Sequence, residues 1–271
     1  MFKLNRVFLF DGSKAPQESS HSDGHGGHSH HHHHHHGGGH SESNLKAIFS
    51  FPAGTLKANE NARINIQIKN SDDTIVKDFE LGHEKLMHLI VVSKDLTFFN
   101  HIHPEFDGAG EFTIDTTFPT GGEYKIIADV LPKGGSSTTL SEWVKVEGEA
   151  EMSGAINADT ELMKIVDGKE VELTLSSMNA NEEVTLTFNF VDTQTKEGIN
   201  NLEQYLGAVG HVVIISEDAN TYLHVHPMNE AETGPNAAFM TDFPKGGIYK
   251  VWGQFQHQGN VFTVPFVVDI K

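Results

Sequence analysis

The chain has 271 residues, no cysteine, and a formal net charge of −18 from 19 Lys and Arg against 37 Asp and Glu. The length predicts one large domain or two small ones. The lack of cysteine excludes disulfides, thiolate metal sites and cysteine nucleophiles. So acidic a surface argues against a nucleic-acid partner, and no apolar run reaches the ~18 residues of a membrane span. The 19 histidines point toward a transition-metal ion as partner.

The first ten residues, MFKLNRVFLF, place Lys3 and Arg6 before a short apolar stretch. That stretch is shorter than the ~7–15 apolar residues of a secretory signal, so no clear signal peptide is identified. Whether Met1 is the true start stays open.

Residues 1–44 are predicted to form a disordered His/Gly-rich tail, because HSDGHGGHSHHHHHHHGGGH has no apolar residue to bury. An expression tag is the alternative, but tags are usually isolated runs of six. We interpret the tract as a metal-gathering tail that suits capture of copper, zinc or nickel better than catalysis. Its candidate ligands are His21, His25, His28, His30, His31, His32, His33, His34, His35, His36 and His40.

Two later segments repeat each other. HLIVVSKDLTFFNHIHP begins at His88 and HVVIISEDANTYLHVHP begins at His211, and both contain His-x12-His-x-His-Pro. Downstream, FPTGGEYKIIADV is echoed by FPKGGIYKVWGQF. This self-similarity predicts two homologous domains, at 45–150 and 151–271, joined through the acidic segment GEAEMSGAINADT.

Each copy has the alternating pattern of half-buried β-strands. Ile64, Ile66 and Ile68 alternate with polar residues in the first copy, and the run from Val184 to Phe190 does so in the second. Seven or eight short strands per copy predict an all-β fold of two tandem immunoglobulin-like β-sandwich domains. The tyrosines after the two FPxGG turns resemble tyrosine corners.

The repeat core of the first copy is predicted to be a hairpin that turns at Lys94-Asp95. Paired residue numbers would then sum to 189, with His88 opposite His101 and His103 on the same face. Three imidazoles meeting in this way would supply three nitrogen ligands to a metal ion. A register slip of one residue would turn His88 to the other face.

In the second copy the corresponding sum is 435, and His211, His224 and His226 form the equivalent triad. The expected fourth ligands differ between the copies: His83 in the first and His257 in the second. Met228, just after HVHP, could approach a soft copper site. Two sites of unequal affinity would follow, useful for passing an ion onward.

These histidines also have interpretations other than metal binding. A histidine at a strand end is more often a hydrogen-bonded rim or core residue than a ligand, and only the repetition favours a metal site. The chain has no Gly-x-Ser-x-Gly and no His-Glu-x-x-His, so nucleophilic catalysis and a helical zinc site gain no support and no catalytic residue is assigned.

The segments HEKLMHLIVVSKDLTFFNHIHPEFDGAGEF and LGAVGHVVIISEDANTYLHVHP resemble the YtkA-like group of extracytoplasmic β-sandwich proteins. The chain also resembles periplasmic copper-resistance sandwich proteins, but it lacks their Met-rich loops. The resemblance implies metal handling and an extracytoplasmic location, in the periplasm or cell envelope. HVH is similar to a motif of copper–zinc superoxide dismutases, whose surrounding motifs are missing.

These observations predict a non-enzymatic protein that binds, buffers or delivers a transition metal. Copper is the first choice, zinc the second, and nickel a further option at the tail. A metal transporter or chaperone could receive the ion. The alternatives are a copper-dependent redox enzyme of the superoxide-scavenging type, and a structural or adhesion sandwich module whose histidines bind no metal.

Overall fold

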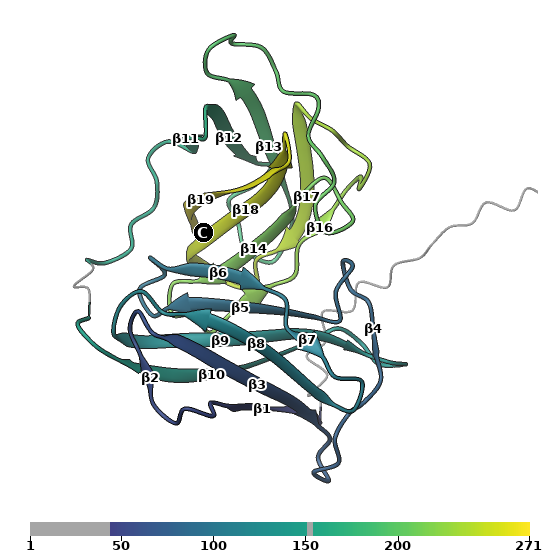
Figure 1. Cartoon of the computed structure of the whole chain (residues 1–271). Helices are drawn as coiled ribbons and strands as arrows, with labels where there is room; N and C mark the ends of the chain where they lie inside the picture. Colours follow the sequence, from purple (N-terminus) through teal and green to yellow (C-terminus); the bar gives the residue numbers. More distant parts are fainter. Residues whose placement is uncertain (1–43, 151–153) are drawn as a thin grey trace, which may run out of the picture. The chain divides into compact units, whose positions relative to one another are not determined.

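The computed structural model describes residues 44–150 and 154–271, and this part of the chain contains strands and turns but no helix (Figure 1). Accordingly, the described residues include no helix with the length and apolar character needed to cross a bilayer. The predictions for the N-terminal tail fall on residues outside this part. The described residues of the two repeats belong to one compact unit.

The first repeat is a sandwich of two sheets (Figure 1). One sheet has the order β1 (Lys46–Ser50), β3 (Asn61–Lys69), β8 (Glu111–Thr117), β7 (Glu105–Phe106). The other has the order β2 (Leu56–Lys57), β10 (Thr138–Glu147), β9 (Gly122–Pro132), β5 (Met87–Ser93), β6 (Phe99–Ile102), with β4 (Phe79–Glu80) also paired to β9.

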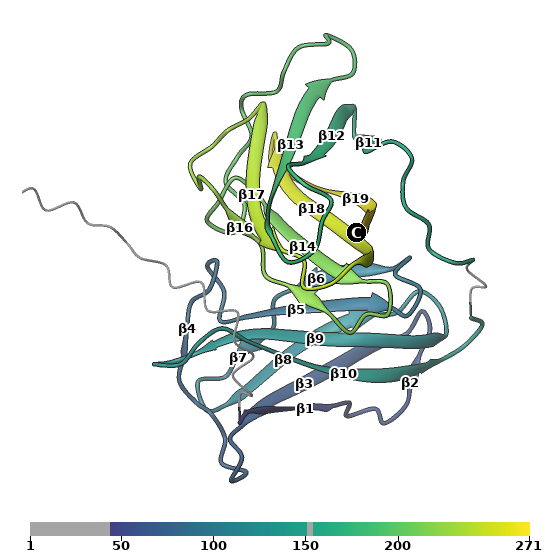
Figure 2. The same cartoon turned by 180° about the vertical axis from the view of Figure 1, so that it is seen from behind.

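The second repeat has the same two-sheet construction, which is clearest from behind (Figure 2). Its first sheet has the order β11 (Met163–Val166), β12 (Lys169–Leu175), β13 (Glu183–Asp192), β17 (Asn236–Asp242), β16 (His226–Pro227). Its second sheet has the order β15 (Tyr222–Leu223), β14 (His211–Ser216), β18 (Gly247–His257), β19 (Asn260–Ile270). Without the two-residue strands, seven strands remain in the described part of each repeat, as predicted.

Period-two alternation builds each core. Ile64, Ile66 and Ile68 of β3 are fully buried between the sheets of the first sandwich, and the predicted alternation in β13 buries Phe188 and Phe190 in the second. The predicted tyrosine corners are present, since Tyr124 and Tyr249 donate hydrogen bonds to backbone carbonyls four residues upstream, each at 2.9 Å. The fold prediction of two tandem immunoglobulin-like sandwiches is confirmed.

Strands β5 and β14 are buried on both faces. In β5, Leu89 and Val91 face the core of their own sandwich, whereas Ile90 and Val92 join a third apolar cluster. The rest of this cluster comes from both repeats: Leu96, Ile127, Val213, Ile215, Ala219 and Trp252. The outer face of β5 therefore packs against the outer face of β14.

Reciprocal polar contacts surround this apolar cluster. Lys125 Nζ of the first repeat donates to the Ala219 carbonyl of the second at 2.5 Å, and Lys250 Nζ of the second donates to the Leu96 carbonyl of the first at 2.6 Å. The two lysines occupy equivalent positions after the FPxGG turns. The repeats thus contact each other with approximate two-fold symmetry.

The predicted hairpin register is wrong by two residues. Ile90, not His88, lies opposite His101, so paired numbers sum to 191, and Ile214 lies opposite Leu223 in the second repeat, giving 437. The turn is centred one residue later than predicted because Leu96 and Ala219 adopt left-handed backbone angles, with φ of 57° and 54°. A shift of two keeps every side chain on its face.

The two tryptophans of the chain test the inter-repeat cluster. Trp252 is 3% exposed and stacks on Phe99 at 4.6 Å between ring centroids, whereas Trp143 is 37% exposed. We expect Trp252→Ala to lower the free energy of unfolding by about 3–5 kcal/mol, because it leaves a large cavity. The matched Trp143→Ala should cost under about 1 kcal/mol. Urea denaturation measures both, and equal losses would contradict this packing.

Candidate metal centre

The first triad meets on the outer face of β5 and β6. His88 lies on the same face of β5 as Ile90, His101 pairs with Ile90 across the hairpin, and His103 follows His101 by two residues. One nitrogen from each of the three imidazoles lies within 4.8 Å of the other two. Their ring centroids are 5.1, 5.0 and 4.7 Å apart. The predicted convergence of His88, His101 and His103 is therefore present.

The outer nitrogens of His88 and His101 face oxygen acceptors. His88 Nε2 donates to the Gly82 carbonyl at 2.8 Å, and His101 Nδ1 donates to Gln254 Oε1 at 2.6 Å. The Gln254 amide is oriented by its own nitrogen, which donates to Thr263 Oγ1 at 3.3 Å. In the neutral tautomers each ring has one proton, and these acceptors place it on the outer nitrogen.

The inner nitrogens then present lone pairs to each other. His88 Nδ1 and His101 Nε2 are 2.9 Å apart. Two lone pairs at that distance repel unless a cation, either a proton or a metal ion, lies between or beside them. This arrangement matches metal-ligating histidines, which commonly donate the remaining ring N–H to a carbonyl or other oxygen.

Two further imidazole nitrogens are buried without a hydrogen-bond partner. They are Nε2 of His103 and Nε2 of His211, the first residue of β14 in the second repeat. The His211 ring centroid lies 5.3 Å from that of His88 and 4.8 Å from that of His101. An unpaired buried polar atom costs free energy, so both nitrogens are ready to accept a donor or bind an ion.

Burial keeps these imidazoles neutral. The pKa of His101 is lowered from 6.5 to about 3 and that of His103 to about 4, chiefly by burial and also by the charge of neighbouring groups, His88 among them. The pKa values of His88 and His211 are also lowered, chiefly by burial. Neutral imidazole is the form that coordinates metal.

His83, the expected fourth ligand of the first site, lies in a tight turn with φ of 46°. Its ring centroid is 6.1 Å from that of His88 and 5.4 Å from that of His211. It is half-buried, and neither it nor His211 belongs to the 4.8 Å group. The equivalent turn of the second repeat has Leu206 with φ of 54°, so that turn offers no imidazole. That the two repeats use different fourth ligands stays a prediction.

The second triad does not meet in the described part of the chain. His211 packs among the histidines of the first repeat, while His224 Nδ1 lies 3.7 Å from Asp129 Oδ2 and its Nε2 lies 3.2 Å from Thr139 Oγ1. His226 is exposed in β16, in the other sheet from His211. The expected equivalence of the two triads is therefore corrected: strand β15 ends at Leu223, and the chain then crosses to the opposite sheet.

The remaining predicted ligands lie elsewhere. His257 Nε2 is 3.0 Å from Asn201 Oδ1, and burial lowers its pKa. Met228 is 54% exposed. The prediction that these residues and the tail histidines bind metal stays a prediction.

Gln254 is the site residue that sequence reasoning missed. It lies opposite His211 in β18 and reaches His101 of the other repeat. The available signal was the continuous apolar run after each first histidine, LIVV and VVII, because runs without alternation indicate strands buried on both faces. A second buried face implies a partner surface, which here is the other repeat.

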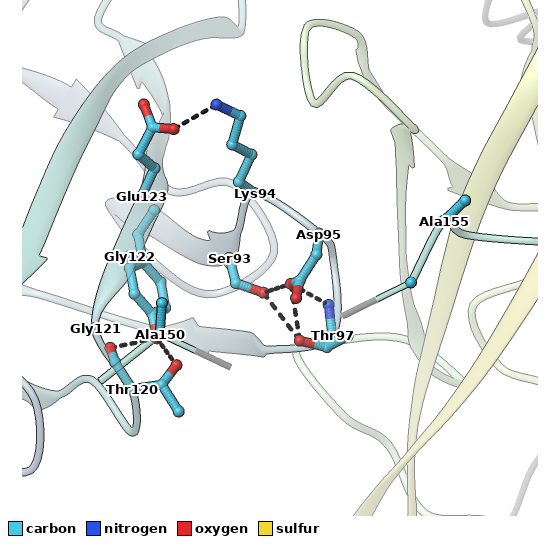
Figure 3. Close-up of a pocket in the computed structure, with 12 residues that line it drawn as sticks. Ser93, Lys94, Asp95, Thr97, Thr120, Gly121, Gly122, Glu123, Ala150 and Ala155 are labelled. Atoms are coloured by element: carbon cyan, nitrogen blue, oxygen red, sulfur yellow. Dashed lines mark hydrogen bonds and ion pairs between the residues drawn. The ribbon is translucent and has the colours of Figure 1, made fainter. Parts of the chain in front are cut away.

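A separate surface pocket of about 420 Å³ lies near the β5–β6 turn (Figure 3). Lys94 and Glu123 form an ion pair at its rim, and Asp95 Oδ1 accepts hydrogen bonds from the backbone and side chain of Thr97. These contacts organise the turn. None of the histidines lines this pocket.

A family model described as a domain of unknown function, DUF8832, matches the chain twice, over residues 44–148 and 164–271. The chain belongs to the DUF8832 family. The comparisons give no support to the expected membership of the YtkA-like or copper-resistance groups. The search of curated proteins gave no match to this sequence.

Several solved structures are similar to the DUF8832 chain in fold. The FdeC adhesin of Escherichia coli matches at 13% identity and a TM-score of 0.29, covering 84% of this chain and 65% of that one. The D00-D0 domain of intimin matches at 13% identity and a TM-score of 0.24, covering 84% of this chain and 99% of that one. The adhesin InvE of Yersinia pseudotuberculosis matches at 11% identity and a TM-score of 0.24, covering 85% of this chain and 61% of that one. No functional statement follows at these values.

Because of the buried histidines, we expect the free energy of unfolding of the two DUF8832 repeats to depend on pH. Their folded pKa values lie below the ordinary 6.5, so the unfolded chain binds more protons, and the free energy of unfolding falls as pH drops through 6.5 toward 4. At pH 5 the loss for His101 alone is about 2 kcal/mol.

Urea denaturation at pH 7.5 and pH 5.0 measures this loss. His101→Gln, which has no proton to gain, should show a smaller difference between the two pH values than the parent. Equal stability of the parent at both pH values would show that these imidazoles are not held neutral by the fold.

Proposed function

We propose that this protein is a non-enzymatic metal-binding module that holds one transition-metal ion at His88, His101 and His103. Copper is the first choice and zinc the second, because imidazole nitrogen suits both ions. The observation that carries the proposal is the pair of inner nitrogens, 2.9 Å apart, on rings whose outer nitrogens donate to Gly82 and Gln254 oxygens. Both lone pairs are directed at a place that a cation would fill.

The tail has a different role in this proposal. Its eleven histidines, between His21 and His40, capture copper, zinc or nickel loosely and pass the ion to the ordered imidazoles. The burial of His88 and His101 opposes an open coordination position, which a copper redox enzyme would need. An extracytoplasmic location and a transporter or chaperone that receives the ion belong to the same proposal.

A structural or adhesion module is the second candidate, and one observation favours it. If the Gln254 amide is turned over, its nitrogen donates to His101 Nδ1, His101 Nε2 donates to His88 Nδ1, and His88 Nε2 donates to Gly82. That chain satisfies two neutral imidazoles without any metal. The histidines would then be polar contacts that help to fix the two repeats together.

Metal titration separates the two candidates. The full-length chain with glutamine at all eleven tail histidines should bind about one equivalent of Cu²⁺ or Zn²⁺ in competition with a chelator. His88→Gln, His101→Gln and His103→Gln should each weaken binding at least ~100-fold, since even outer-shell changes cost 10–100-fold.

Tyr222→Phe serves as the control. It removes a hydroxyl that donates to Asp129 Oδ2 at 3.4 Å but takes away no imidazole, so affinity should be retained. A parent chain that binds no ion after the tail change would leave the structural or adhesion module as the function.

A further inference from the structure

We propose that His211 of the second repeat is the fourth ligand of this metal site, so that one ion joins the two sandwiches. The inference rests on the proposed function and adds to it a ligand and a consequence. Sequence reasoning assigned His211 to a separate site and His83 as the fourth ligand of the first. The geometry points to a different set.

The placement of His211 comes from the packing of β14 on β5. His211 shares its strand face with Val213 and Ile215, which are fully buried in the inter-repeat cluster. Gly210, directly before it, permits the close approach of this strand to its neighbour, since a Cβ there would lie 2.4 Å from a ring carbon of Phe255. The burial of Val213 and Ile215 and the close approach at Gly210 together place His211 at the inter-repeat surface.

The centroid separations suit His211 as a ligand beside His88 and His101. At metal–nitrogen distances of 2.0–2.1 Å, tetrahedral coordination places imidazole centroids about 5 Å apart. The centroid separations among His88, His101 and His103 are 4.7–5.1 Å, and His211 lies 5.3 Å from His88 and 4.8 Å from His101. His83 is 6.1 Å from His88 and only half-buried.

The state of the His211 nitrogen also favours ligation. The residue is 9% exposed, and its Nε2 is buried with no hydrogen-bond partner. The rings of His211 and His88 are parallel, at 7° between planes, whereas an ion lies in the plane of each imidazole that binds it. Binding therefore requires the His211 ring to rotate about its Cβ–Cγ bond. This rotation breaks no hydrogen bond of Nε2, because Nε2 has no partner.

Gln254 acts as a positioning residue from the same repeat. It lies opposite His211 in the β14–β18 ladder and accepts from His101 Nδ1. The second repeat thus supplies one ligand and the orientation of another. Because both reach across the inter-repeat surface, an ion bound there should stabilise the docked pair, and separating the repeats should release it.

The test uses the full-length chain with its eleven tail histidines changed to glutamine. His211→Gln removes a ligand, so it should weaken Cu²⁺ or Zn²⁺ binding at least ~100-fold, because even outer-shell changes cost 10–100-fold. X-ray absorption should count three imidazoles instead of four. Lys250→Met is the matched control, since it removes a contact between the repeats to the Leu96 carbonyl but no imidazole, and it should retain affinity.

The outcomes separate this inference from the proposed function. No binding by the parent overturns both. Binding by the parent with unchanged affinity and coordination in His211→Gln overturns the inference alone, as does a loss seen in His83→Gln but not in His211→Gln. A loss in His224→Gln equal to that in His211→Gln would restore the separate second triad.

A second measurement covers a His211→Gln variant that fails to fold. The ring ¹⁵N resonances of His211 are recorded in the folded parent with and without Zn²⁺. Coordination moves the resonance of the bound nitrogen. Resonances of His211 that stay unchanged while those of His101 move would overturn the inference.

Discussion

Packing of the outer face of β5 against the outer face of β14 is the constraint on which the rest of the structure depends. Ile90 and Val92 have no place in the core of their own sandwich, and their complete burial is achieved by Val213 and Ile215 of the other repeat. Removing such side chains from water is worth about 1.5–3 kcal/mol each. The same contact surrounds the histidines at the end of these strands with protein.

The environment of the histidines follows from that contact. A single sandwich would leave His88 and His101 on an open sheet face, where water would satisfy their nitrogens. In the docked pair the acceptors are fixed protein oxygens from both repeats, Gly82 on one side and Gln254 on the other. Tautomer, ring orientation and neutrality are therefore set by the arrangement of two domains.

The sequence predicts the features that depend on residue alternation within a strand and on the internal repeat. Alternation identified β3 and β13. The spacing His-x12-His-x-His predicted that His88, His101 and His103 share one face, and this holds for any shift of the hairpin register by an even number of residues. The register itself depended on Leu96 accepting a left-handed conformation, which its side chain gives no reason to expect. The placement of His211 and Gln254 depends on docking between repeats, which no pattern within one repeat encodes.

The reciprocal lysine contacts carry a consequence for the origin of the chain. In an isologous interface residue i contacts j and j contacts i, and Lys125 to Ala219 with Lys250 to Leu96 has that form within one polypeptide. The molecule is built like a homodimer whose subunits have been fused. Fusion permits what identical subunits cannot achieve: equivalent positions hold Asp129 in one half and Gln254 in the other, and each meets a different histidine. The neutral amide of the second repeat faces the enclosed His101 of the first, and the carboxylate of the first repeat faces the exposed His224 of the second.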